Sequence, residues 1–319
     1  MAIPRIFTDQ PLTAGTEIAL EPGPSHHLLK VLRLKPGAGL CLFNGRGGSF
    51  AAVLAGSRGP EARVAVGDFA PADHESPLAI ELAIGVSRGE RMDWVVQKAV
   101  ELGVTAIRPL VTERTEVRLG GERRDKKLGH WRQIAIAACE QCGRNRLPAI
   151  HAPQPLADWL PAAAGLRLVL APEATTALAG VEATAPDAVT LLIGPEGGLS
   201  AVEIDVAVAA GFRAVGLGPR VLRTETAPLA ALAICQARWG DFSAKDALNN
   251  RHARGRGCVK RRCRVGKAQR AHADLRPAPR PVPRGHGLSA FAHPTVRGFS
   301  ISAVWEAFTQ SRKRASRRP

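Results

Sequence analysis

Two short apolar runs, each broken by a glycine-bearing polar loop, constrain the fold of this chain most. The first run, VTLLI, covers residues 189–193 and ends at GPEGG, residues 194–198. The second run, AVGL, covers residues 214–217 and ends at GPRVLRTET, residues 218–226. Short apolar runs bounded by Gly and Pro are typical of buried parallel strands. Because open α/β sheets bind ligands at the carboxyl ends of their strands, we expect the two loops to form one site.

Strand and helix patterns alternate on either side of these loops. Apolar spacing predicts strands at 78–86, 106–111 and 166–170, and helices at 90–102, 126–143, 200–211 and 226–239. Ser200 and Glu203 have the spacing of a capping box. Pro109 favours an edge or strand-end position for its strand. Strands that alternate with helices imply parallel pairing and an α/β domain.

The first part of the chain has a different pattern. Turn signals recur at short intervals up to about residue 70, with short apolar runs at 17–20, 40–43 and 63–66. Such spacing predicts a small β-barrel. Ser25 is expected to be the N-cap of one helix. The polar, Pro-flanked stretch PADHESP marks a boundary, so we expect domains at 1–72 and 73–242.

The net charge of +16 is confined to the end of the chain. Residues 243–319 hold 19 Lys and Arg against 3 Asp and Glu, which leaves 25 basic and 25 acidic residues in 1–242. The basic segment lacks apolar periodicity over most of its length, so we expect disorder there. In the balanced part, any nucleic-acid site must be a local patch.

Other sequence features narrow the class of protein. No apolar run reaches membrane-spanning length and no signal peptide begins the chain, so a soluble cytoplasmic protein is expected. The single CxxC at 139–142 is a weak signal, and no metal site is expected. The chain lacks GxGxxG after its first α/β strand and also lacks a P-loop, which disfavours the corresponding nucleotide sites.

Four ordered motifs resemble one known family. They are GERMDWVVQKAVELG at 89–103, ERT at 113–115 with EQCGR at 140–144, LIGPEGGLS at 192–200, and LGPRVLRTETA at 217–227. Together they resemble the bacterial 16S ribosomal RNA (uracil-N3)-methyltransferases, the RsmE family of the SPOUT superfamily. The resemblance covers residues 1 to about 242.

The resemblance implies a fold, a cofactor and a partner. The fold would be a PUA-like β-barrel followed by a SPOUT-type α/β domain with a C-terminal trefoil knot. The family acts as a homodimer on 16S rRNA of the small ribosomal subunit and forms N3-methyluridine in the decoding region. Its cofactor, S-adenosylmethionine, would be bound here by loops at 170–175, 193–198 and 217–226.

The residue types in these loops suit that cofactor. Glycines let the backbone approach a ligand closely, and leucine and isoleucine side chains can form walls for an adenine ring. The residues expected to bind the cofactor are Leu170, Glu173, Ile193, Gly194, Glu196, Gly197, Gly198, Leu217, Gly218, Arg220, Leu222 and Thr226.

Methyl transfer to uracil N3 requires alignment of the nucleophile with the methyl group and loss of the N3 proton. A cation would stabilise the resulting anion, and Arg223 is the first candidate, ahead of Arg220. Glu225 or Glu196 could accept the proton. The alternatives are structural: Arg223 and Glu225 could form an ion pair that stiffens the loop, and Glu196 could cap a helix.

Contacts with RNA are expected elsewhere. The candidate residues are Arg5, Arg33, Arg91, Arg114, Arg144 and Arg146, each of which could instead be a solvated surface charge. Two other functions stay open: a SPOUT methyltransferase with another RNA target, and a non-catalytic RNA-binding or ribosome-assembly protein. Binding of S-adenosylmethionine would argue against the non-catalytic alternative.

Overall fold

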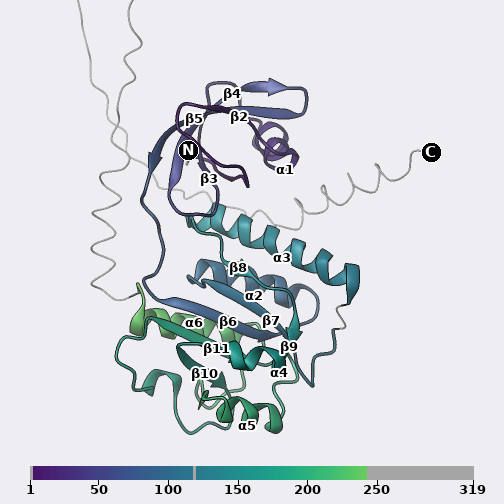
Figure 1. The fold of residues 1–319 in the computed structure, drawn as a ribbon, viewed down its shortest axis with the longest axis vertical. Helices are drawn as coiled ribbons and strands as arrows, with labels where there is room; N and C mark the ends of the chain where they lie inside the picture. The colour runs from purple at the N-terminus through teal and green to yellow at the C-terminus, as the bar shows by residue number, and fades with distance from the viewer. Residues whose placement is uncertain (1–2, 118–119, 243–319) are drawn as a thin grey trace, which may run out of the picture. The chain divides into compact units, whose positions relative to one another are not determined.

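The structure is a computed structural model that describes residues 3–117 and 120–242. Figure 1 draws these residues in colour. The basic segment 243–319 lies outside the described residues, so its expected disorder stays a prediction.

The N-terminal part of the chain contains a five-stranded sheet in the order β1-β3-β4-β5-β2 (Figure 1). Its strands are β1 (Arg5–Phe7), β2 (Glu17–Ala19), β3 (Gly39–Phe43), β4 (Ser49–Arg58) and β5 (Glu61–Ala70). β1 is parallel to β3, and the other pairs are antiparallel. Side chains from the strands, such as Leu40 and Leu42, form one apolar core. The strands predicted in this region are confirmed.

The helix in this part begins earlier than predicted. α1 (Pro22–His26) continues into a π-helical turn, His27–Val31. The prediction that Ser25 is the N-cap is therefore wrong. Its hydroxyl is fully buried, donates to the carbonyl of Leu20 at 2.9 Å and accepts from the N–H of Ala62 at 3.0 Å. Proline favours the first helical turn, which explains the earlier start.

The second sheet has the order β12-β10-β11-β6-β7-β8, and β9 also pairs with β7. Its strands are β6 (Ala79–Gly85), β7 (Ala106–Val111), β8 (Ala149–Ile150), β9 (Gln154–Pro155), β10 (Leu166–Leu170), β11 (Ala188–Ile193) and β12 (Arg213–Val215). The helices between them are α2 (Glu90–Glu101), α3 (Gly121–Cys142), α4 (Leu156–Trp159), α5 (Ala201–Ala209) and α6 (Thr226–Trp239). All pairings in this sheet are parallel, which confirms the predicted α/β domain.

Helices cover both faces of the parallel sheet (Figure 1). One apolar core contains buried residues of α2, α3 and α6, and a second contains those of α4 and α5. Along β11, Leu191 and Ile193 belong to the first core and Leu192 to the second. A strand buried on both faces explains why the run at 189–193 is apolar apart from Thr190, whose hydroxyl donates to the carbonyl of Ala164.

Pro109 does not mark an edge strand, so that prediction is wrong. β7 lies between β6 on one side and the two short strands β8 and β9 on the other. β8 pairs with Ala106 and Ile107, whereas β9 pairs with Leu110 and Val111. Pro109 lies in the gap between them, where the N–H that proline lacks is not needed.

The capping box of α5 is confirmed. Ser200 Oγ accepts from the N–H of Glu203 at 3.3 Å, and the Glu203 carboxylate accepts from the N–H of Ser200 at 2.9 Å.

We expect Ser200→Ala to lower the free energy of unfolding by about 1 kcal/mol, because a helical N–H loses its acceptor. Urea unfolding would measure this effect. Ser200→Asp retains a capping oxygen and should stay close to wild type, and equal losses in both variants would contradict the assignment.

Polar contacts join the N-terminal sheet to the end of α3. Glu140 accepts from the N–H of Phe7 at 2.9 Å, and Arg5 Nη2 donates to Asn145 Oδ1 at 2.6 Å. Phe7 and Phe43 pack in the same apolar core as α3. Since α3 returns from the carboxyl edge of the parallel sheet to its amino edge, these contacts lie toward the amino edge.

We expect the stability contributed by Glu140 to fall as the pH rises. Burial raises the pKa of its carboxyl, and this effect exceeds the lowering by the Phe7 N–H and Arg5. A carboxyl whose pKa is raised on folding destabilises the protein as the pH passes from its unfolded pKa, about 4.3, up through its folded pKa. Glu140→Gln keeps the acceptor without the charge, so its stability relative to wild type should increase between about pH 4 and neutrality. Urea unfolding across this range would measure it, and a pH-independent difference would contradict it.

Candidate functional site

Four loops follow parallel strands and meet at the carboxyl edge of the sheet. They are residues 86–89 after β6, 171–177 after β10, 194–200 after β11 and 216–225 after β12, and we call them the strand-end cluster. The N–H of Gly216 donates to the carbonyl of Thr176 at 2.9 Å, which joins the loops after β10 and β12. Thr224 Oγ1 donates to the carbonyl of Gly194 at 3.2 Å, which joins the loops after β11 and β12. The two loops expected to form one site are therefore in direct contact.

The loop after β11 folds back on itself at Gly194. A Cβ atom on Gly194 would lie 2.5 Å from the nitrogen of Leu199 and 2.6 Å from the carbonyl carbon of Gly198. No larger residue fits at that distance. Gly198 has a φ of +70°, and its N–H donates to the carbonyl of Pro195 at 2.8 Å. The close approach expected at Gly194 is thus made by the chain's own backbone, whereas no heavy atom lies within 4 Å of a Cβ position on Gly198.

Glu196 ties this loop to the start of α2. Its Oε1 accepts from the N–H of Arg88 and from Arg91 Nη1, both at 2.9 Å. Burial acts to raise the pKa of Glu196, but the hydrogen bonds from Arg88 and its own backbone, together with Arg91, lower the pKa overall. A carboxylate held by two donors, with a lowered pKa, is a poor proton acceptor.

A second set of contacts fastens the same loop to the segment after β7. Arg114 Nη1 donates to the carbonyl of Gly197 at 2.8 Å, and a Cβ on Gly197 would lie 3.0 Å from the Cβ of Arg114. The carboxylate of Glu203 accepts from the N–H of Glu113 at 2.8 Å while it caps α5. The loop at 194–200 is therefore bonded to the segments that follow two neighbouring strands, β6 and β7.

The loop after β12 carries three charged side chains, those of Arg220, Arg223 and Glu225, that have no partner among the described residues. Arg220 and Arg223 are exposed, and Glu225 is half-buried. Within residues 3–117 and 120–242, none of these three side chains forms a hydrogen bond or an ion pair. The alternative in which Arg223 and Glu225 neutralise each other is therefore not observed.

The other residues expected to bind a cofactor differ in accessibility. Leu170, Leu217 and Leu222 are half-buried, and Glu173 and Thr226 are exposed. Ile193, in contrast, is 4% exposed and packs in the core. Gly218 has a φ of +97°, with no heavy atom within 4 Å of the position of a Cβ.

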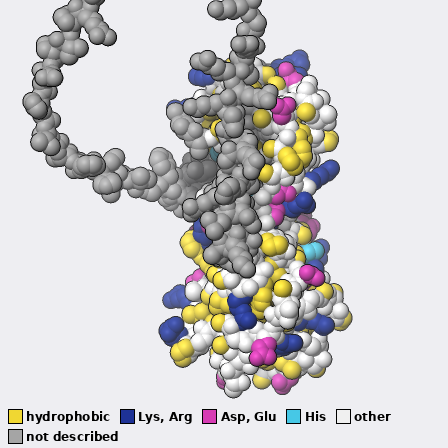
Figure 2. Space-filling view, turned by 90° about the vertical axis from the view of Figure 1, so that its left-hand side faces the viewer, with side chains coloured by type: hydrophobic (Ala, Val, Ile, Leu, Met, Phe, Trp, Pro, Cys, Tyr) yellow, Lys and Arg dark blue, Asp and Glu magenta, His cyan; other side chains and the backbone are white. Residues whose placement is uncertain are grey.

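The six candidate RNA-contacting arginines have different environments. Arg144 is 4% exposed and donates to Glu75 and to the carbonyls of Val100 and Val104. Arg5 is half-buried and donates to Asn145. Arg91 pairs with Glu196, and Arg114 holds the loop after β11. Arg146 is exposed and pairs with Asp73 at 3.3 Å, and Arg33 is exposed with a φ of +51°. Figure 2 shows Lys and Arg side chains spread over the visible face among acidic and apolar ones.

Sequence reasoning missed Ser87 and Thr224. Ser87 Oγ lies 3.3 Å from Thr224 Oγ1, and both residues are buried. A usable signal was present, because β6 was predicted as a strand of the same sheet. The rule that directs attention to carboxyl ends of strands applies equally to residues 86–89.

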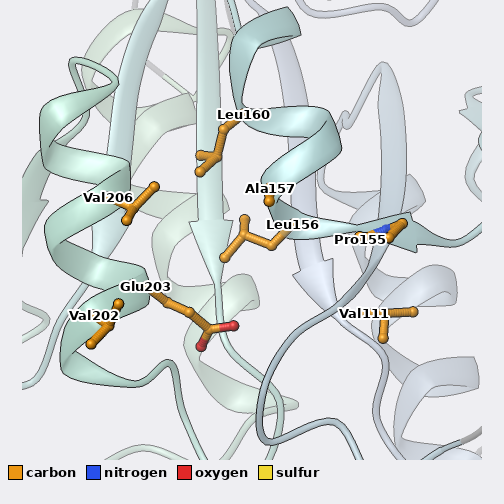
Figure 3. Close-up of a pocket in the computed structure, with 8 residues that line it drawn as sticks. All are labelled: Val111, Pro155, Leu156, Ala157, Leu160, Val202, Glu203 and Val206. Atoms are coloured by element: carbon orange, nitrogen blue, oxygen red, sulfur yellow. The ribbon is translucent and has the colours of Figure 1, made fainter.

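An apolar groove lies between α5 and α4, outside the strand-end cluster (Figure 3). It is lined by Val111, Pro155, Leu156, Ala157, Leu160, Val202, Glu203 and Val206. None of the residues expected to bind the cofactor lines this groove.

Two further properties of the described residues bear on the class of protein. None of their helices is long and apolar enough to cross a bilayer. Their His, Cys, Asp and Glu side chains form no group of three that could hold a metal ion.

Comparison with known protein families places the chain in a class of RNA-modifying enzymes. Residues 74–236 match the family model of an RNA methyltransferase domain, and residues 25–64 match that of an RNA methyltransferase PUA domain. The chain is therefore an RNA methyltransferase with a PUA-like N-terminal domain. More narrowly, it belongs to the ribosomal RNA small subunit methyltransferase E family, as the sequence motifs predicted.

Relatives define this family membership. The chain is 35% identical over 243 residues to ribosomal RNA small subunit methyltransferase E of Buchnera aphidicola from Schizaphis graminum, a match that covers 76% of this chain and 98% of the relative. The enzyme of the same name from Bacillus subtilis is 30% identical, with 71% and 92% covered. The solved structure of the Neisseria gonorrhoeae enzyme, bound to S-adenosyl methionine, is 40% identical with a TM-score of 0.72, and 76% and 100% of the two chains are covered. A Legionella pneumophila methyltransferase structure, also with this cofactor, has the same identity and TM-score.

Proposed function

We propose that this chain transfers a methyl group from S-adenosylmethionine to N3 of a uridine in the decoding region of 16S rRNA. The names of its relatives support the class of RNA, and two relatives were solved with the cofactor. The structural observation that carries the proposal is the strand-end cluster, in which the predicted loops meet through Thr224 and Gly194.

The residues of the cluster fit this cofactor. The half-buried side chains of Leu170, Leu217 and Leu222 lie in or beside two joined loops and offer apolar contact for an adenine ring. The open backbone at Gly218 leaves space for a ligand, and the exposed carboxylate of Glu173 can accept hydrogen bonds. When bound, S-adenosylmethionine supplies the methyl group.

Two side chains of the loop after β12 suit the remaining chemistry. Arg223, exposed and unpaired among the described residues, would stabilise the negative charge that develops on the uracil when N3 loses its proton. Glu225, two residues further on, would accept that proton. Glu196 is the weaker candidate for this role because its carboxylate already accepts hydrogen bonds from the N–H of Arg88 and from the side chain of Arg91.

The wider proposal concerns fold, assembly and RNA contacts. We infer a trefoil knot, a homodimer, domains at 1–72 and 73–242, and a cytoplasmic location. In support of a knot, the chain leaves β12 at one edge of the sheet and passes Gly194 and Ser87, at the ends of β11 and β6, before α6 begins. Arg33 and Arg146, both exposed, stay candidates for phosphate contacts, and Arg91 and Arg114, which are also exposed, could contact RNA beside the cluster.

Two measurements test the proposal. Calorimetry should detect binding of S-adenosylmethionine, and no binding would favour a non-catalytic RNA-binding function. Incubation of undermethylated small subunits with the protein, followed by mapping of modified nucleotides, should show one new N3-methyluridine in 16S rRNA. A different product, such as a 2′-O-methylated ribose, would contradict the assigned reaction.

A further inference from the structure

We propose that Thr224 is a positioning residue, which acts with Ser87 to set the backbone of residues 223–225 for methyl transfer. This inference rests on the proposed function. Ser87 and Thr224 are 3% and 9% exposed, so water does not compete freely for their hydroxyls. They come from loops that are 137 residues apart in the sequence.

The hydrogen bonds run in one direction. Thr224 has a single hydroxyl proton, and it is donated to the carbonyl of Gly194 at 3.2 Å. The contact at 3.3 Å between the two hydroxyls must then be donated by Ser87 and accepted by Thr224. The resulting chain, from Ser87 through Thr224 to Gly194, connects the ends of β6, β12 and β11.

The position of Thr224 determines what this chain controls. Its neighbours in sequence are Arg223 and Glu225, the two residues assigned to the chemistry. The carbonyl of Arg223 accepts from the N–H groups of Thr226 and Ala227 at 2.9 and 3.0 Å, so α6 begins directly from this segment. Residues 223–225 are thereby attached to the ends of the neighbouring strands by the Thr224 side chain and to α6 by the carbonyl of Arg223. Loss of the Thr224 hydroxyl would release the first of these attachments.

A matched control separates positioning from general stability. Thr190, on β11 of the same parallel sheet, is 3% exposed, and its hydroxyl donates at 2.8 Å to the carbonyl of Ala164, which precedes β10. Thr190→Val and Thr224→Val each remove one buried hydroxyl and keep the side-chain shape, so comparable losses of stability are expected. Only Thr224 adjoins residues assigned to the reaction.

The test compares Thr224→Val, Thr224→Ser, Ser87→Ala and Thr190→Val by thermal unfolding, calorimetry with S-adenosylmethionine and single-turnover methylation of small subunits. We expect Thr224→Val to slow methylation at saturating cofactor by about 10- to 100-fold, because small misplacements of reacting groups are costly. Its affinity for the cofactor should weaken about fivefold, the equivalent of one ordinary hydrogen bond. Thr224→Ser, which keeps the hydroxyl, and Thr190→Val should retain both properties. Ser87→Ala should lose less of the methylation rate than Thr224→Val. The double variant Ser87→Ala with Thr224→Val should be no slower than Thr224→Val alone.

The outcomes separate this proposal from the proposed function. Wild-type kinetics in Thr224→Val, equal losses in Thr224→Ser, or an equal loss in Thr190→Val would each overturn the positioning role. If the wild-type protein binds the cofactor but methylates no RNA, the proposed function fails. In that case, the affinities of Thr224→Val and Thr190→Val for the cofactor still test whether Thr224 positions the loop, and equal affinities would overturn it.

Discussion

Replacement of Arg223 by alanine is expected to slow single-turnover methylation of the small ribosomal subunit by about 10²- to 10³-fold, the usual consequence of removing a group that stabilises developing charge. The side chain is exposed in the strand-end cluster and has no acidic partner among the described residues. Its charge is therefore free to act on the uracil anion. Affinity for S-adenosylmethionine, measured by calorimetry, should change little, because this effect arises only in the transition state.

Two variants control this experiment. Arg223→Lys retains the charge without the planar guanidinium and should have an intermediate rate. Arg213→Ala removes another exposed arginine, which lies on β12 and donates to the carbonyl of Glu182 at 3.1 Å. This variant should methylate at the wild-type rate. If Arg223→Ala methylates as fast as Arg213→Ala, Arg223 has no part in the chemistry. Arg220→Ala would then be the next variant to measure.

The largest expected effect on stability comes from Arg144→Ala, which should lower the free energy of unfolding by about 3–5 kcal/mol. Arg144 Nη2 lies 2.6 Å from Glu75 Oε2, and Nη1 donates to the carbonyls of Val100 and Val104 at 2.9 and 2.8 Å. Removal of the guanidinium leaves the Glu75 carboxylate, itself mostly buried, without its cation. Unfolding by guanidinium chloride, monitored by circular dichroism and tryptophan fluorescence, would measure this loss of stability.

The neighbouring Arg146 supplies the control. Its ion pair with Asp73 has a longer separation of 3.3 Å, and its side chain is 60% exposed. Arg146→Ala should therefore cost no more than about 1 kcal/mol. Similar losses in the two variants would show that burial does not set the strength of these pairs. A weakened affinity for RNA in Arg146→Ala alone would support its assignment as a phosphate contact.

Local structure in the parallel sheet was predictable because it depends on neighbours in the sequence. Apolar periodicity located α2 and α6 within a residue or two, and the Ser200 capping box was correct. Predictions failed where the outcome depends on another strand. Pro109 is tolerated inside the sheet because β8 and β9 leave a gap. Ser25 lies inside α1, and its hydroxyl bonds to the backbone of Leu20 and Ala62 instead of capping the helix.

The sequence by itself determined the parallel α/β architecture and the two loops at 194–198 and 218–226, since turn chemistry and strand patterning are local properties. Its four motifs also determined the family. Only the tertiary structure decided which polar side chains stay free to act. Glu196 is occupied by Arg88 and Arg91 from more than 100 residues away, and Arg144 is enclosed by Glu75, whereas Arg223 and Glu225 keep their charges unpaired within the described residues. The physical reason is that the energy of a charged or hydroxyl group depends on its burial and its partners, and both are set when distant segments pack together.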